Sequence, residues 1–140
     1  SLRVVEETPL VQQVALSNVS SDDVELWVRS RWLSAEMEKA LRELVAAKAE
    51  LADLERQMQA TDAELQRLAQ DQERLRKNLG ALGSSTAEQQ LRGRYVDQLQ
   101  KSEDRVAEQT AARQKLAERR DEKRKALERR IAELALEHKL

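Results

Sequence analysis

The feature that most constrains this chain is an apolar repeat of seven residues that runs without a break from residue 37 to residue 82. One seam position holds Met37, Leu44, Leu51, Met58, Leu65, Gln72 and Leu79, and the position three residues later holds Ala40, Ala47, Leu54, Thr61, Leu68, Leu75 and Leu82. Only Thr61 and Gln72 are polar among these fourteen residues. Apolar residues in this spacing lie on one side of a helix and wind it around a partner helix in a left-handed supercoil. The repeat therefore predicts a long coiled-coil helix.

The end of the repeat predicts a reversal of the chain. Gly80 and Gly83 are expected to end the helix as residues that tolerate positive φ. Ser85 and Glu88 form the capping-box pattern that opens a second helix. A short polar connection between two long helices produces an antiparallel hairpin, in which facing positions have numbers that sum to about 170. Leu44 then faces Leu127.

The predicted fold is mainly α, a long antiparallel coiled-coil hairpin on a small N-terminal β-hairpin base. The hairpin domain covers residues 34–140, with Ser34 as N-cap, a helix at 35–82, a turn at 83–85 and a helix at 86–138. The base covers residues 1–33. Alternating apolar residues predict strands at 11–17 and 24–30, joined by a polar turn at 18–23. Because an isolated β-hairpin is only marginally stable, we expect it to belong to a larger sheet, with Trp32 covering the junction.

Composition limits the chemistry that the chain can perform. It has 36% charged residues, 2% aromatic residues and a formal net charge of −1. It contains no Cys and one His, His138, so thiolate nucleophiles, disulfides and multi-histidine metal sites are excluded. We predict no enzymatic activity, no cofactor and no metal. No apolar run reaches the length of a membrane span and no signal peptide is visible, while a start at Ser1 indicates a piece of a longer protein.

Two groups of basic residues are the candidate sites for a partner. The first lies at the predicted tip of the hairpin: Arg74, Arg76, Lys77, Arg92, Arg94 and Tyr95. One interpretation is that these residues contact a partner. The other is that Arg74 and Arg76 pair with Glu88 and hold the end of the hairpin closed. Gly93 costs helix stability, which suggests close approach of another backbone.

The second group is a possible basic stripe on the second helix, made of Arg113, Arg120, Lys123 and Arg124. These cations fall on or beside the seam. One interpretation is ion pairing across the hairpin with acidic residues of the first helix such as Glu50. The other is a surface for phosphate or an acidic partner, which the interleaved acidic residues and the lack of aromatic residues argue against.

The tip residues also carry a resemblance. The run Gln-Glu-Arg-Leu-Arg-Lys-Asn-Leu at residues 72–79, followed by Leu91-Arg92-Gly93-Arg94-Tyr95, Leu99 and Glu103, resembles the helical segment of bacterial proteins related to the mucoidy inhibitor A family. The resemblance covers roughly residues 10–135. It implies a β-rich body elsewhere in a longer chain, export to the periplasm or cell envelope, and no established enzymatic activity.

These observations predict a structural or protein-interaction arm. Leu41 and Val45 flank the seam and would be partly wet in a two-helix hairpin, which favours a homodimer through the hairpin. A prefoldin-like holder is one alternative, although prefoldin places its strands between its helices. A nucleic-acid-binding arm is the other, although the balanced charge gives no general attraction to nucleic acid.

Overall fold

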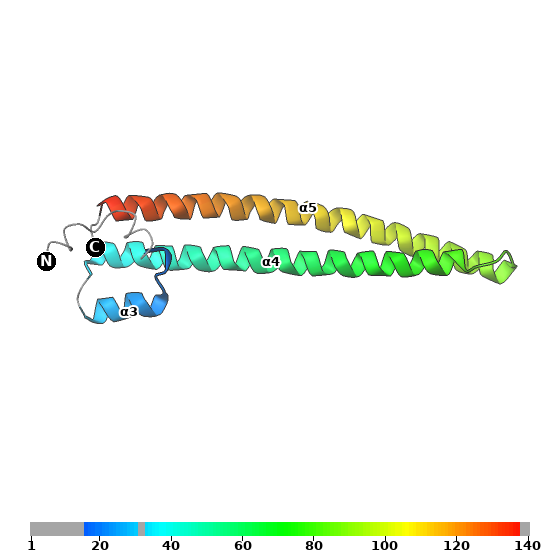
Figure 1. Ribbon diagram of the computed structural model, residues 1–140, viewed down its shortest axis with the longest axis horizontal. Coiled ribbons are helices and arrows are strands. Elements are labelled where there is room, and N and C mark those ends of the chain that lie inside the picture. The colour runs from blue at the N-terminus through cyan, green and yellow to red at the C-terminus, as the bar shows by residue number, and fades with distance from the viewer. Residues whose placement is uncertain (1–15, 31–32, 138–140) are drawn as a thin grey trace. The chain divides into compact units, whose positions relative to one another are not determined.

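The computed structural model describes residues 16–30 and 33–137 and contains three helices (Figure 1). They are α3 (Ser21–Arg29), α4 (Ala35–Gly80) and α5 (Thr86–Glu137). The prediction of a mainly α-helical chain is confirmed, and the described residues contain no strand.

The predicted strand at residues 24–30 is wrong, because most of it lies in α3. Val24 is fully buried and Leu26 is 58% exposed, although strand alternation would put them on one face. Ser20 starts the helix with a complete capping box: its hydroxyl accepts from the Asp23 N–H and its own N–H donates to the Asp23 carboxylate. Residues 16 and 17 are also helical, while residues 11–15 and Trp32 lie outside the described residues. The β-hairpin base is therefore not supported.

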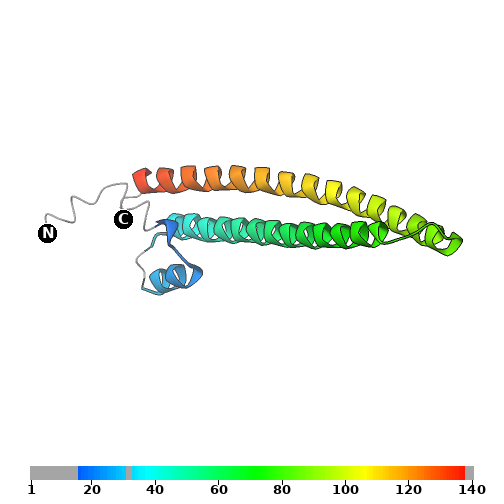
Figure 2. The same ribbon diagram turned by 45° about the vertical axis from the view of Figure 1, so that its right-hand side comes forward.

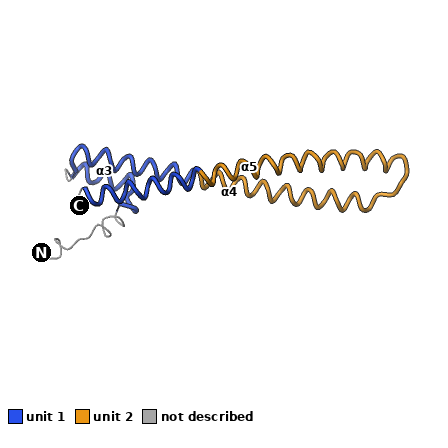
Figure 3. The backbone as a smooth tube through the Cα atoms, turned by 90° about the horizontal axis from the view of Figure 1, so that it is seen from above, with its two compact units in different colours: residues 1–53, 119–140 blue, residues 54–118 orange. Residues whose placement is uncertain are grey.

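The chain divides into two compact units, shown in blue and orange in Figure 3. Unit 1 comprises residues 1–53 and 119–140, so it contains α3, the start of α4 and the end of α5. Unit 2 comprises residues 54–118, the remaining parts of α4 and α5 with the turn between them. Within each unit the α4 and α5 segments run in opposite directions (Figures 1 and 2).

Unit 1 is built around an apolar cluster to which all three helices contribute. Its buried members are Leu16, Val19, Val24, Met37, Ala40, Leu41, Leu44, Ile131, Leu134 and Ala135. Lys48 adds a polar contact, since its Nζ donates to the Val19 carbonyl at 2.9 Å where the chain enters α3. The predicted pairs are consistent with this cluster: it contains both Met37 and Leu134, and Leu127 packs against the cluster that contains Leu44.

The cluster changes the expectation for Leu41 and Val45. Leu41 is fully buried, and Val45 is half-buried against the cluster. A third helix of the same chain packs into the cluster that holds Leu41, so this part of the molecule no longer needs a second copy to shield it from water.

Unit 2 contains only two helix segments, and the apolar residues of its part of α4 are concentrated in the seam between them. Leu54, Met58, Leu68 and Leu75 of α4 are buried. The positions beside this seam are polar or charged, for example Asp62, Glu64 and Asp71. Two helices therefore cover the apolar surface of unit 2 without a third.

Burial follows the seven-residue repeat along the whole of α4. Each of the fourteen seam positions from Met37 to Leu82 is buried or half-buried. On α5 the less exposed residues also follow three- and four-residue steps, at Ser102, Val106, Gln109, Arg113, Leu116, Arg120, Lys123 and Leu127. The seam of α5 is thus the more polar of the two.

The two ends of α4 match their predictions only in part. Ser34 caps α4 as predicted, since its hydroxyl accepts from the Met37 N–H at 3.1 Å. At the other end, neither Gly80 nor Gly83 has the positive φ that was expected. Instead, the N–H groups of Ala81 and Leu82 turn to carbonyls three residues back, which tightens the last turn.

Candidate interaction surfaces

The turn between α4 and α5 is closed by two charged side chains of α5. The Ser85 hydroxyl accepts from the Glu88 N–H at 3.2 Å and donates to the Glu88 carboxylate at 2.7 Å. The same carboxylate accepts from the Gly83 N–H. Arg92 donates to the carbonyls of Leu82 and Gly83 at 3.2 and 3.5 Å, beyond the C-terminal end of α4. A positive charge at this end of a helix also suits its dipole.

These contacts perturb the Glu88 carboxylate. The hydrogen bond from the Ser85 hydroxyl, followed by that from the Gly83 N–H, holds the pKa of Glu88 below its usual value. A β-carbon at position 83 would lie 2.9 Å from a carboxylate oxygen of Glu88, so glycine leaves the room that this contact needs.

The six predicted tip residues thus divide into different roles. Arg92 holds the turn, Tyr95 is half-buried, and Lys77 pairs with Glu73 at 3.4 Å. Arg74, Arg76 and Arg94 are exposed, and none has a hydrogen bond or ion pair to any described residue. The predicted contact of Arg74 and Arg76 with Glu88 is not formed.

Most of the other cations of unit 2 differ from Arg74, Arg76 and Arg94 in having a partner within the chain. Arg67, Lys101, Arg105 and Arg113 all pair with carboxylates. Outside the tip, Lys115 is the one further cation in the described part of unit 2 without an interaction. Uncompensated positive charge is therefore concentrated near the turn.

The possible basic stripe is occupied by contacts within the chain. Arg113 donates from Nε and Nη2 to the two carboxylate oxygens of Asp62 of α4, and Lys123 pairs with Glu50. Arg120 pairs with the neighbouring Asp121 at 3.1 Å, and Arg124 is also engaged in an interaction. The hydrogen bond to Asp62 raises the pKa of Arg113. Two of these contacts, Arg113–Asp62 and Lys123–Glu50, join α5 to α4, whereas Arg120–Asp121 lies within α5.

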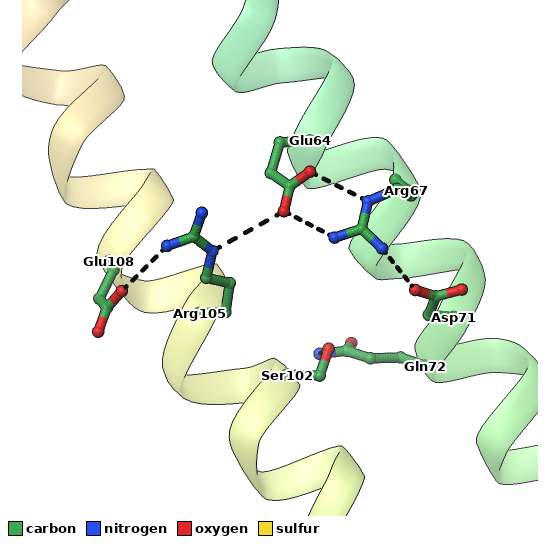
Figure 4. A network of polar contacts seen from close by, with 7 residues as sticks. All are labelled: Glu64, Arg67, Asp71, Gln72, Ser102, Arg105 and Glu108. Atoms are coloured by element: carbon green, nitrogen blue, oxygen red, sulfur yellow. Dashed lines mark hydrogen bonds and ion pairs between the residues drawn. The ribbon is translucent and has the colours of Figure 1, made fainter.

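A polar network that the sequence did not reveal lies in unit 2 (Figure 4). Glu64 accepts from both Nε and Nη2 of Arg67, at 3.0 and 2.7 Å, and lies 3.8 Å from Arg105 of α5. The hydrogen bond from Arg67 is the main reason that the pKa of Glu64 is lowered. Arg67 also reaches Asp71, and Arg105 reaches Glu108.

Beside this network, Gln72 donates to the hydroxyl of Ser102 at 3.2 Å (Figure 4). Ser102 is 8% exposed, so a polar pair interrupts the apolar seam at this level. The seam position of Gln72 was visible in the sequence. Its partner was not, because Ser102 follows a stretch of α5 where the spacing of Leu91, Tyr95 and Leu99 departs from the repeat.

Comparisons of the chain with known protein families, with curated proteins and with solved structures found no match. They do not bear on the resemblance to proteins related to the mucoidy inhibitor A family, which stays a prediction.

The surface hollows in the described residues are shallow and lie along α4. One is lined by Ala35, Lys39, Arg42 and neighbours, and another lies between α3 and α4 over Val45, Ala46 and Ala49. Within the described ranges, no group of acidic residues and histidine has metal-binding geometry, and no helix is long and apolar enough for a bilayer. What the surface offers is exposed charge on a helical scaffold, which suits contact with a macromolecule.

Proposed function

We propose that this chain is a non-enzymatic coiled-coil arm that binds a protein partner through its tip. The observation that carries the proposal is the predicted seam, which runs along α4 to Leu79 and ends at Leu82 in the turn, and which is buried or half-buried at every position. A strict 3-4 spacing kept over this length supports winding of α4 and α5 as an antiparallel coiled coil.

The distribution of charge supports the tip as the contact region. Five cations of unit 2 pair with carboxylates, whereas Arg74, Arg76 and Arg94 have no partner among the described residues. An arginine kept without an internal partner is available for a carboxylate of another protein. Arg92 and Glu88 fix the turn beneath these side chains, so the tip is ordered before a partner binds.

Neither alternative gains support from a specific contact. The prefoldin-like holder depended on a β-hairpin base, and residues 21–29 form a helix instead. The nucleic-acid-binding arm would use the cations from Arg113 to Arg130 or the tip. Four cations of the first group already have interactions within the chain: Arg113, Arg120, Lys123 and Arg124. The balanced charge of the chain gives neither region a general attraction to nucleic acid.

The test compares two triple variants by proximity cross-linking in the cells that produce the protein. One variant replaces Arg74, Arg76 and Arg94 with Ala. The control replaces Arg119, Lys125 and Arg129, which are equally exposed cations outside the tip, and so changes the net charge by the same amount. We expect a cross-linked protein that the tip variant loses and the control keeps. If both variants keep the same set of cross-linked proteins as the unmodified chain, the proposed tip function is wrong.

A further inference from the structure

Unit 2 carries a second repeat on α5, on the exposed side of the helix. Gln89, Gly93, Val96, Gln100, Glu103 and Ala107 follow alternating steps of four and three residues, and all six are exposed. Thr110 and Gln114 continue the same steps and are exposed as well. We call these eight residues the outer stripe. Glu103 is the only charged residue in it, although 36% of the chain is charged.

Two members of the outer stripe have no explanation within their own chain. Val96 is 51% exposed and is the one large apolar side chain in the described part of unit 2 that is so open. Gly93 costs about 1 kcal/mol of helix stability relative to alanine, yet no atom lies within 4 Å of the position that a β-carbon would take. An open glycine beside an exposed valine allows the backbone of another helix to come close.

We propose that the outer stripe is the surface through which two copies of this chain associate, with their α5 helices parallel. The inference rests on the proposal that the chain is an interaction arm and adds a self-association surface to it. A stripe in 3-4 spacing is the pattern that packs against another helix in a left-handed supercoil. With the two α5 helices parallel, each residue of the outer stripe faces the same residue of the partner copy.

The charges beside the outer stripe select this partner and orientation. Gly93, Gln100, Ala107 and Gln114 are each the first stripe position of a heptad. In a parallel pair of helices, the residue just before such a position lies near the residue of the partner helix whose number is five higher. This places Arg92 near Asp97 of the partner copy, and Arg113 near Glu118 of the partner copy, in addition to their contacts within the chain. An antiparallel pair would instead bring Asp97, Asp104 and Glu118 of both copies together along one flank. Charge complementarity therefore favours a parallel second copy.

The size of the surface predicts a weak dimer. The outer stripe spans residues 89–114, on the order of 38 Å of helix at 1.5 Å per residue. Contact along such a length buries on the order of 800 Å² in total, below the roughly 1,200 Å² of stable interfaces. Glu103 facing itself weakens the dimer further, because like charges at a core position repel each other.

This repulsion provides a test that strengthens the contact instead of breaking it. Glu103→Leu removes the paired charges and adds an apolar layer, while the exposed position leaves the fold of one chain undisturbed. We expect the variant to associate at least about tenfold more tightly than the unmodified chain in sedimentation equilibrium, because tenfold corresponds to about 1.4 kcal/mol. Glu122→Leu, at an exposed residue beyond the outer stripe that takes no part in the proposed charge pairs, is the matched control and should gain no affinity.

Cross-linking then fixes the orientation, since the chain has no cysteine of its own. Val96→Cys should form a disulfide between copies under mild oxidation, because parallel helices bring this position against itself. Gln98→Cys is the control, as it is exposed but about 200° away around the helix. If Glu103→Leu associates no more tightly than the unmodified chain, or if Val96→Cys cross-links no faster than Gln98→Cys, the proposal is overturned. Both failures would leave the tip experiment untouched, because that experiment detects a different protein and spares the outer stripe.

Discussion

The burial of Leu41 leads to a prediction that tests the packing of unit 1 directly. Leu41 is 0% exposed and belongs to the same cluster as Val24 of α3. In a bare two-helix hairpin it would flank the seam and remain partly wet. The cost of truncating this side chain therefore measures whether α3 is docked in solution.

The expected magnitude follows from complete burial. Leu41→Ala removes apolar atoms from a closed core and leaves a cavity, which should lower the free energy of unfolding by about 2–5 kcal/mol. Leu26→Ala is the matched control on α3 itself. Because Leu26 is 58% exposed, its truncation should cost less than about 0.5 kcal/mol.

The assay is urea unfolding of the full chain, followed by far-ultraviolet circular dichroism and by tryptophan fluorescence. Trp27 packs against the cluster that contains Leu41, so its emission reports on the docking of α3. A double-mutant cycle between Leu41→Ala and Val24→Ala should show a coupling of about 0.5–3 kcal/mol, as for residues that share a core. If Leu41→Ala costs no more than Leu26→Ala, α3 does not cover this part of α4, and the account of unit 1 is refuted.

Three further predictions concern unit 2. Gly93→Ala should raise the free energy of unfolding of the monomer by about 0.5–1 kcal/mol in urea titrations at low concentration, and any loss of stability would mean that the position needs glycine within one chain. Because the pKa of Glu88 is lowered on folding, its contribution to stability is present above the ordinary value and is lost as the pH falls through the folded value. Melting temperatures should therefore fall less on acidification below about pH 4.5 for Glu88→Gln than for the unmodified chain, and identical acid profiles would contradict this. Gln72→Leu should cost about 1–3 kcal/mol by leaving the Ser102 hydroxyl without its partner, whereas adding Ser102→Ala should restore most of that loss. A double variant less stable than Gln72→Leu alone would show that the pair was not the cause.

The sequence predicted the seam well because one physical requirement repeats fourteen times along α4. Every residue from Met37 to Leu82 that was assigned to the seam is buried or half-buried. A single error in the spacing would have moved the later positions to the exposed side. The ends of the helix were predicted less well, because side-chain contacts of Arg92 and Glu88 replace the left-handed glycine that was expected at Gly80 or Gly83.

The strand at residues 24–30 was predicted wrongly for a different reason. Val24 and Val28 are each two residues from Leu26, which fits a strand, but Val24, Trp27 and Val28 also fit one face of a helix. A helix of nine residues is too short to be stable alone, so its formation depends on docking against Leu41 and its neighbours. The sequence of residues 21–29 alone does not indicate that they pack against Leu41. The partners of the basic residues were missed for a similar reason, since the register gave the neighbourhood of Arg113 without identifying Asp62.

The contacts between the helices also suggest an order in which the chain folds. Hydrogen bonds join residues separated by 3 positions at Ser85–Glu88, 10 at Arg92–Leu82, 30 at Gln72–Ser102, 51 at Arg113–Asp62 and 73 at Lys123–Glu50. Because the entropy lost on closing a loop grows with its length, contacts near the corner are the easiest to make first. Each contact then shortens the loop that the next one must close. We therefore expect folding to proceed from the turn between α4 and α5 toward the two ends of the chain. A destabilising substitution beside this turn should slow folding more than an equally destabilising substitution near Lys123.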